Sequence, residues 1–190
     1  PCSEIILRPY QFCNLSEVVV RATDNLKTLE NKVRLATILG TFQATLTDFK
    51  YIRKVWKDNT EEERLLGVSL TGILDNQLMS GKSAMFGMNI KTTLQTLKDK
   101  AIETNEQMSK CLGIPQAAAI TCVKPSGTVS QLVDSASGIH ARHNPYYIRT
   151  VRGDNKDPLT QFMIAQGIPA EPDVMKPDST TVFSFPMQSP

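Results

Sequence analysis

Long apolar runs, clusters of one charge and closely spaced cysteine pairs are all missing from this 190-residue sequence. No apolar stretch approaches the roughly 18 residues of a membrane span, and no signal or transit peptide is visible. The net charge is only +2 and no Lys/Arg cluster stands out, which gives no electrostatic case for nucleic-acid or membrane binding. We therefore expect no nucleic acid and no membrane among the partners.

The cysteines also exclude two common classes of small protein. Cys2, Cys13, Cys111 and Cys122 form no CxxC pair, and only two histidines are present, which argues against a structural zinc site. Four cysteines in a chain of this size do not make a secreted disulfide scaffold. We expect free thiols, no metal site and a cytoplasmic location. Cys111 and Cys122 lie in apolar stretches, so we interpret both as small structural hydrophobes.

What is present is an ordinary globular composition, 41% hydrophobic and 21% charged, in a chain long enough to bury a core. Strand and helix patterns alternate, which favours an α/β fold with parallel elements. We expect strands at Glu4–Leu7, Leu15–Arg21, 65–72, Ala117–Val123, Tyr146–Arg152 and Thr180–Phe185, and helices at about Thr28–Lys57, Asn89–Leu112 and Pro158–Gln166. The first helix should bury an apolar stripe of Leu35, Ile38, Leu39, Phe42, Leu46, Phe49 and Trp56.

A compact redox and acid/base set opens the chain. Cys2 and Glu4 are two residues apart, so on an extended segment they point to the same face, and Cys13 follows one short strand later. A thiolate is nucleophilic or redox-active, a thiol can lose a hydrogen atom to a stronger radical, and a glutamate can carry protons. The alternative is a buried structural cysteine beside a surface glutamate.

A hydroxyl-rich turn follows the expected strand at Ala117–Val123. Its glycine can let backbone N–H groups approach an anion closely, and its hydroxyls can add hydrogen bonds. The alternative is an ordinary strand-to-helix turn capped by Ser or Thr. The turn consists of Pro125, Ser126, Gly127, Thr128, Val129 and Ser130.

Four ordered motifs together resemble the catalytic chain of ribonucleotide reductase, and most closely its adenosylcobalamin-dependent class II ribonucleoside-triphosphate reductases. They are Pro1-Cys2-Ser3-Glu4-Ile5 with Cys13, then the Lys124–Ser130 turn, then 137–143, and then Tyr146–Arg152. The resemblance runs from the first residue to the last. It implies part of a ten-stranded α/β barrel of the ribonucleotide reductase and glycyl-radical type. Residues 1–190 would form the finger loop and the C-terminal half-barrel, with no separate second domain.

The resemblance also implies a radical chemistry with adenosylcobalamin as cofactor. Cys2 matches the cysteine that becomes a thiyl radical and removes the 3′-hydrogen of the ribose, and Glu4 matches the glutamate that handles the 3′-hydroxyl proton. Cys13 matches one cysteine of the pair that reduces the substrate and ends as a disulfide. Thioredoxin or a similar dithiol would then reduce that disulfide. The partner of Cys13 lies upstream in the family, so we expect a longer or split reductase chain and no turnover by this chain alone.

The remaining motifs would bind the substrate. The Pro125–Ser130 turn matches the segment that binds the phosphates of a ribonucleoside triphosphate or diphosphate. His140, Arg142 and His143 either contact substrate or cofactor or form a structural polar loop. Two other interpretations stay open: a non-catalytic nucleotide-binding or assembly fragment, and a piece of a class I ribonucleoside-diphosphate reductase large subunit.

Overall fold

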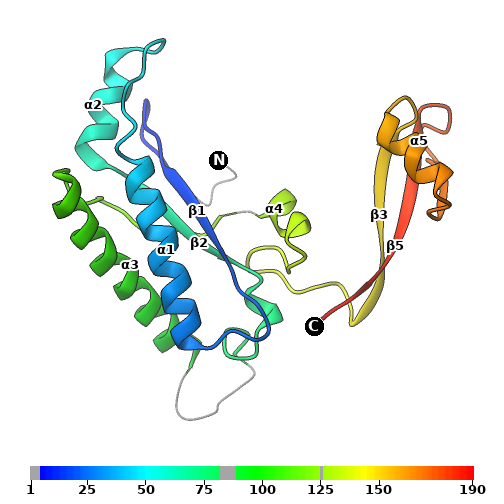
Figure 1. Ribbon diagram of the computed structural model, residues 1–190, viewed down its shortest axis with the longest axis horizontal. Coiled ribbons are helices and arrows are strands. Elements are labelled where there is room, and N and C mark those ends of the chain that lie inside the picture. The colour runs from blue at the N-terminus through cyan, green and yellow to red at the C-terminus, as the bar shows by residue number, and fades with distance from the viewer. Residues whose placement is uncertain (1–4, 82–88, 125) are drawn as a thin grey trace. The chain divides into compact units, whose positions relative to one another are not determined.

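The computed structural model describes residues 5–81, 89–124 and 126–190, which form two compact units. The first unit ends at Ala141 and the second begins at Arg142. Figure 1 shows the elements of each unit, and the two are described separately below. None of the helices in the described ranges has the length and apolar character needed to cross a membrane.

The first unit is built on a short parallel sheet. Strand β1 (Asn14–Val19) pairs with β2 (Leu66–Thr71), with Asn14 opposite Leu66 and Val19 opposite Thr71. The segment 117–122 runs along the other edge of β2, where Leu66 N donates to Ala119 O at 2.9 Å and Cys122 N donates to Val68 O at 3.0 Å. In the described ranges, β1 pairs with no strand on its outer edge.

Two long helices cover one face of this sheet (Figure 1). Helix α1 (Leu26–Gln43) begins at a capping box between Asn25 and Thr28, and α3 (Ile90–Leu112) begins at Asn89, whose side chain accepts from Thr92 N. Gly113 ends α3 in the left-handed region at φ 65°, as its sequence position predicts. The core lies between the helices and the sheet, where Val18, Leu29, Val33, Leu66, Val68, Leu97 and Ala101 are buried.

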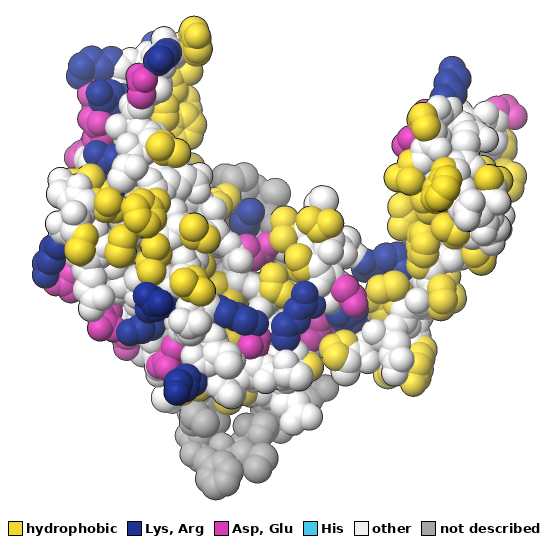
Figure 2. Space-filling view, viewed as in Figure 1, with side chains coloured by type: hydrophobic (Ala, Val, Ile, Leu, Met, Phe, Trp, Pro, Cys, Tyr) yellow, Lys and Arg dark blue, Asp and Glu magenta, His cyan; other side chains and the backbone are white. Residues whose placement is uncertain are grey.

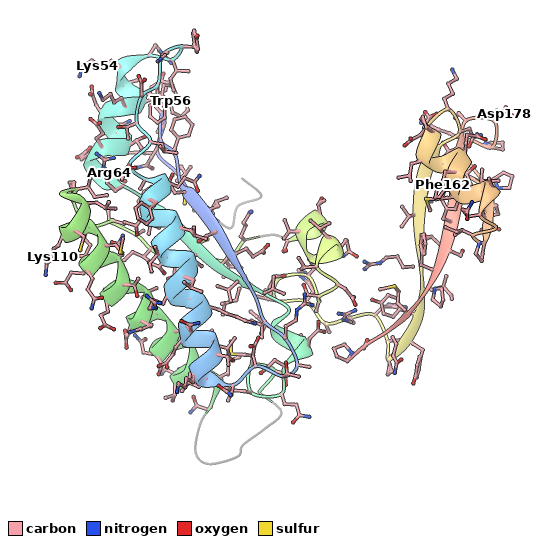
Figure 3. The ribbon with its side chains drawn as sticks, in the orientation of Figure 1. Lys54, Trp56, Arg64, Lys110, Phe162 and Asp178 are labelled. Atoms are coloured by element: carbon pink, nitrogen blue, oxygen red, sulfur yellow. The ribbon has the colours of Figure 1, made fainter. Side chains whose placement is uncertain are left out.

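The single helix expected over Thr28–Lys57 is wrong, because α1 ends at Gln43 and a second helix, α2 (Lys54–Glu63), follows an irregular segment. Arg64, labelled in Figure 3, closes α2 with a left-handed backbone at φ 46°. Its guanidinium donates to the carbonyl oxygen of Ala44 at 2.6 Å. That bond joins the end of α2 to the end of α1 and satisfies a terminal carbonyl.

The expected buried stripe of α1 is also wrong. Leu39 is 67% exposed and Leu46 is 70% exposed, and Leu35 and Phe42 are exposed as well. The face that packs on the sheet instead carries Ala36, Thr37, Gly40 and Thr41 together with Leu29 and Val33. Small residues let the helix approach the sheet closely, because a methyl group on Gly40 would already stand 3.5 Å from the Leu66 side chain.

Other expected elements differ at their ends. Residues 5–7 form no strand, and 117–123 is a bridge beside β2 instead of a full strand, paired at Val68 and Thr121. A 3₁₀ turn, η1 (Ile73–Asp75), follows β2, and the short helix α4 (Gly127–Leu132) follows the hydroxyl-rich turn. The strand expected at 65–72 and the helix expected at Asn89–Leu112 are confirmed.

The second unit is an antiparallel sheet in the order β3–β5–β4 with one helix. Its elements are β3 (Tyr146–Asp154), α5 (Pro158–Ala165), β4 (Ala170–Pro172) and β5 (Thr180–Gln188). Phe183 is 1% exposed and anchors the unit, while Phe162 of α5, labelled in Figure 3, is mostly exposed. The expected strands and helix are confirmed here, but the antiparallel pairing differs from the parallel arrangement that the alternation favoured.

Candidate functional site

Three of the residues singled out in the sequence lie outside the described ranges. Cys2, Glu4 and Pro125 have no described position, so their roles stay predictions. Cys13, the remaining five residues of the hydroxyl-rich turn and the loop residues His140, Arg142 and His143 are described.

Cys13 stands directly before β1 and follows a segment that packs on α2. The ring of Phe12 stacks on that of Trp56 with centroids 4.6 Å apart, and Tyr10 meets Trp56 edge-on at 5.8 Å. Phe49 lies 5.1 Å from Phe12 and completes the group. Figure 3 shows Trp56 on α2. Aromatic pairs in these geometries add stability beyond the area they bury, so the group holds the chain that leads into Cys13.

Polar contacts hold the same segment to α2. The side-chain nitrogen of Asn59 donates to the carbonyl oxygen of Tyr10 at 3.0 Å, and the Gln11 amide donates to Glu63. Arg8 pairs with Glu62 at 2.6 Å, an exposed contact of small energetic weight. Together with the aromatic group, these bonds fix where the chain enters β1.

The side chain of Cys13 lies on the face of the sheet opposite α1. Side chains alternate between the two faces of a strand, and α1 covers the face of Ser16 and Leu66. The opposite face carries Cys13, Leu15 and Glu17 from β1, with Gly67 and Ser69 from β2. We call this group of five residues the thiol face.

A second sulfur reaches the same place from the far edge of β2. A methyl group on Gly67 would stand 2.9 Å from Sγ of Cys13 and 3.1 Å from Sγ of Cys122, so the two sulfurs are no farther apart than the sum of these distances. Both cysteines are free and half-buried. Because Gly67 has no side chain, the two sulfurs and Cδ2 of Leu15 share the space over its Cα.

Burial keeps both thiols protonated. Burial, followed by the neighbouring Cys122, raises the pKa of the Cys13 thiol to about 11. Burial also raises the pKa of Cys122; the charge of Lys124 acts in the opposite direction, and Glu17 adds to the rise. At neutral pH both groups are thiols, so neither is a strong nucleophile until a base takes its proton.

Two polar side chains on the thiol face lack hydrogen-bond partners among the described residues. Both carboxylate oxygens of Glu17 and the hydroxyl of Ser69 are shielded from solvent and unpaired, and the two residues stand opposite each other in the β1–β2 register. Buried polar groups are normally hydrogen-bonded. These atoms therefore offer positions for a hydrogen-bond donor that comes from outside the described residues.

The hydroxyl-rich turn leads into α4. Ser126 occupies the N-cap position but makes no side-chain capping bond, and its buried hydroxyl is unpaired within the described ranges. Ser130 instead donates to Gly127 O at 3.1 Å, while Gly127 has open space around its Cα. The Ser126 side chain therefore does not accept the backbone N–H bond of a typical N-cap.

The third set of predicted residues is divided between the units. His140 ends the first unit, where its Nδ1 lies 3.1 Å from Ser137 O. Arg142 and His143 begin the second unit, where His143 meets Tyr147 edge-on with ring centroids 6.3 Å apart. His140 and His143 are exposed, and their contacts decide neither for a ligand nor for a structural loop.

Sequence reasoning missed Cys122 as a neighbour of Cys13 and missed Glu17 and Ser69 on the same sheet face. The alternation along β1 was the available signal, because it places Cys13, Leu15 and Glu17 on one face. The position of Cys122 depends on the pairing of 117–122 with β2, which no local pattern reveals. In the described ranges, no group of three His, Cys, Asp or Glu side chains could hold a metal ion.

The known proteins similar to this chain include several reductases of one kind. An adenosylcobalamin-dependent ribonucleoside-triphosphate reductase of Lacticaseibacillus paracasei is 29% identical over 211 residues, which covers 100% of this chain and 28% of the relative. The reductase of the same description from Euglena gracilis is 30% identical over 190 residues, which covers 98% of this chain and 25% of the relative. No protein-family model matches the chain.

A solved structure supports the fold independently. A B12-dependent class II ribonucleotide reductase superposes with a TM-score of 0.78 at 24% identity, covering 100% of this chain and 29% of that one. The α/β class is therefore confirmed. This chain spans between a quarter and a third of the length of the proteins it matches. The resemblance visible in its motifs is confirmed: over its whole length, the chain is similar to one part of the adenosylcobalamin-dependent ribonucleoside-triphosphate reductases.

Proposed function

We propose that this chain is the part of a radical ribonucleotide reductase that carries the hydrogen-abstracting cysteine and one cysteine of the redox pair. The similarity along the whole chain to reductases of that name carries the proposal. The reaction converts a ribonucleotide to a 2′-deoxyribonucleotide for DNA synthesis. We also propose that residues 1–190 belong to a ten-stranded α/β barrel, completed by the rest of the reductase.

Each predicted residue has one task in this proposal. Cys2 removes the 3′-hydrogen, Glu4 holds the 3′-hydroxyl proton, and Cys13 gives a hydrogen to the substrate and enters a disulfide. Thioredoxin or a similar dithiol then returns two electrons to that disulfide. Support comes from the place of Cys13 on the same sheet face as Glu17 and Ser69, whose oxygens are unpaired within the described residues and would offer acceptors to a polar substrate.

The phosphates of the substrate would bind at the turn 125–130. The unpaired hydroxyl of Ser126 and the open space at Gly127 support this, because an anion needs donors and close backbone approach. We propose a triphosphate substrate because the relatives are named for it. His140, Arg142 and His143 stay candidates for contact with substrate or cofactor.

Adenosylcobalamin is the proposed cofactor, again from the names of the relatives. When bound, it supplies the radical that the Cys2 thiol receives. The residues described here include no set of metal-ligating side chains, and we assign none of them to its binding. We expect the remaining part of the reductase chain to hold it.

The remaining chain is also the proposed partner of two surfaces. Helix α1 presents exposed apolar side chains at Leu35, Leu39 and Phe42, and Leu46 is exposed just after the helix; Figure 2 shows a yellow area over α1. Strand β1 leaves its outer edge unpaired in the described ranges. Both features favour a chain that works inside a larger assembly, and we propose that alone it does not turn over.

The test uses a longer reductase that contains this stretch, assayed for adenosylcobalamin-dependent reduction of ribonucleoside triphosphates. Cys2→Ser should abolish product formation entirely. Cys13→Ser should remove turnover driven by a dithiol reductant. Cys111→Ser, on an exposed residue of α3, is the matched control and should keep activity.

Two results would contradict the proposal. Product formation by the Cys2→Ser enzyme would remove the assigned role of Cys2. Reduction that needs a separate radical-generating protein and no adenosylcobalamin would replace the class II assignment with class I.

A further inference from the structure

Cys122 is the only cysteine with a described position that faces Cys13. Of the two described cysteines other than Cys13, Cys111 is exposed near the end of α3, whereas Cys122 shares the space over Gly67 with Cys13. The pairing in the proposed reductase needs an upstream cysteine that this chain does not contain. Cys122 is thus a thiol close to Cys13 that neither the motifs nor the comparisons assign.

We propose that Cys13 and Cys122 form a thiol pair that closes to a disulfide across Gly67 under oxidising conditions, and that this bond withdraws Cys13 from its role in substrate reduction. The inference goes beyond the proposed function, since the bond forms whether or not the chain is part of an active reductase. Its consequence for activity rests on the redox role of Cys13.

The position of Gly67 makes the approach of the sulfurs possible. Cys13 comes from the β1 edge of β2 and Cys122 from the opposite edge, so their side chains must meet over the central strand. An added methyl group on Gly67 would lie within 3.1 Å of both sulfurs, and Gly67 itself places no side chain between them. Cδ2 of Leu15 would overlap the same methyl group, so the end of the Leu15 side chain must turn aside before the sulfurs can bond. Any residue larger than glycine would fill the path of the bond.

Closing the bond also requires the two backbones to move together, because a disulfide needs Cα atoms within roughly 7 Å. Both cysteines stand at ends of regular pairing. Cys13 precedes the first residue of β1, and Cys122 is the last residue that bonds to β2 before an irregular stretch. The aromatic group and the bonds to α2 hold the chain before Cys13, so the movement falls on the Cys122 side, where the end of the pairing shifts at lower cost than the middle of a ladder.

The bond forms by thiol–disulfide exchange with a disulfide oxidant such as oxidised glutathione. The thiolate of one cysteine attacks the glutathione disulfide, forms a mixed disulfide and releases one glutathione. The thiolate of the other cysteine then attacks the protein sulfur of that mixed disulfide and releases the second glutathione. The two cysteines give up two protons and two electrons, and the two glutathione thiols carry both away.

The experiment treats the folded 190-residue chain with oxidised glutathione and maps its disulfides by mass spectrometry without reduction. Cys2→Ser is made in every sample to remove the third thiol near the predicted site. A peptide joining Cys13 to Cys122 is expected in this background and in its Cys111→Ser derivative. The peptide should be lost in both the Cys122→Ser and the Cys122→Ala derivatives, and dithiothreitol should reverse its formation.

A short bifunctional thiol reagent, dibromobimane, gives a second measurement on the same samples. Fluorescent crosslinking of Cys13 to Cys122 without any disulfide would show that the sulfurs are close but cannot bond, and would overturn the proposal. Separate glutathione adducts on the two cysteines without a joined peptide would overturn it as well. Because neither readout measures ribonucleotide reduction, an inactive reductase would leave this result standing.

Discussion

At the scale of single residues, Gly67 in strand β2 and Gly40 in the helix that packs on the sheet should respond to alanine with opposite signs. A methyl group on Gly67 would overlap Leu15 and crowd Cys13, so Gly67→Ala should destabilise the fold by about 1–3 kcal/mol through overpacking. Gly40 lies inside α1 with its nearest neighbour at 3.5 Å, so Gly40→Ala should stabilise it by roughly 0.5–1 kcal/mol. Urea unfolding of both variants checks the pair, and equal effects would contradict the geometry at Gly67.

The Cys13 thiol provides a pH-dependent prediction. Its pKa is raised to about 11 by burial and by Cys122, so the reactive thiolate is scarce at neutral pH and grows as the pH approaches that value. Alkylation of Cys13 by iodoacetamide should therefore accelerate through the alkaline range without levelling off near the ordinary cysteine value of about 8.5. Mass spectrometry of the labelled peptide measures the rate at each pH.

Cys122→Ser is the matched control for that rate. This variant removes the second cause of the raised Cys13 pKa, so the alkylation rate of Cys13 should begin to rise at lower pH. Cys111→Ser should leave the pH dependence of that rate unchanged. A Cys13 rate that levels off in the neutral range in the unmodified chain would contradict the burial of its sulfur.

At the scale of elements, the aromatic group between α2 and the segment before β1 should hold Cys13 in place. Phe12→Ala removes the ring that stacks on Trp56 and should cost about 2 kcal/mol of unfolding free energy, because a partly exposed ring is lost. Trp56 is the chain's single tryptophan, so its fluorescence reports the change directly. The alkylation of Cys13 should also be faster in Phe12→Ala than in the unmodified chain.

The control for the aromatic group is Tyr51→Ala. Tyr51 lies in the connection between α1 and α2 and is 97% exposed, so its removal should change neither unfolding nor fluorescence. Unchanged Cys13 reactivity in Phe12→Ala would mean that the group does not position the cysteine.

In the second unit, Asp173 should make stability depend on acid pH. The hydrogen bond from Arg152 Nε at 2.7 Å, with a further bond from Met175 N, lowers the pKa of Asp173. Because the folded pKa is the lower one, this stabilisation is complete above the unfolded value of about 3.9 and is lost as the pH falls through the folded value. The thermal midpoint of Asp173→Asn should therefore fall less on acidification than that of the unmodified chain.

Thermal unfolding followed through NMR resonances of β3 and β5 measures this difference. Asp178→Asn, on an exposed aspartate of the same loop, should keep the acid dependence of the unmodified chain. An identical pH dependence in Asp173→Asn would show that the Arg152 contact does not govern it.

The sequence predicted the elements that are marked by helix caps or by runs of strand-forming residues. The helix Asn89–Leu112 carries both its cap and its terminal glycine, and β2, β3 and β5 carry dense runs of strand-forming residues. The break after Gln43 was missed because Leu46 and Phe49 continue the helical spacing while their partners lie elsewhere. Cys122 comes close to Cys13 because 117–122 pairs with β2, and the spacing of residues along the sequence does not reveal which segments pair.

At the scale of the whole molecule, the exposed apolar residues of α1 and of the segment just after it should make the isolated chain self-associate. Leu39 and Leu46 are largely exposed, and contiguous apolar surface of this kind favours association. Leu39→Glu with Leu46→Glu should raise the concentration at which the chain stays monomeric, without loss of unfolding free energy. Sedimentation velocity measures the first and urea unfolding the second.

A change at the opposite face of the same helix is the control. Val33→Thr alters a buried position that packs on the sheet, so it should lower the unfolding free energy. It should not raise the concentration up to which the chain stays monomeric. Undiminished self-association in the double glutamate variant would assign the association to another surface.

The outer edge of β1 has a further consequence for how the proposed barrel is assembled. Backbone donors and acceptors that lack a strand partner within the described residues form a template for one incoming strand. The alternation that places Cys13 and Glu17 on one face constrains the register of that strand, since a shift of one residue would reverse the face of every side chain. Whichever strand completes the sheet therefore places alternate side chains on the thiol face, alongside those of β1.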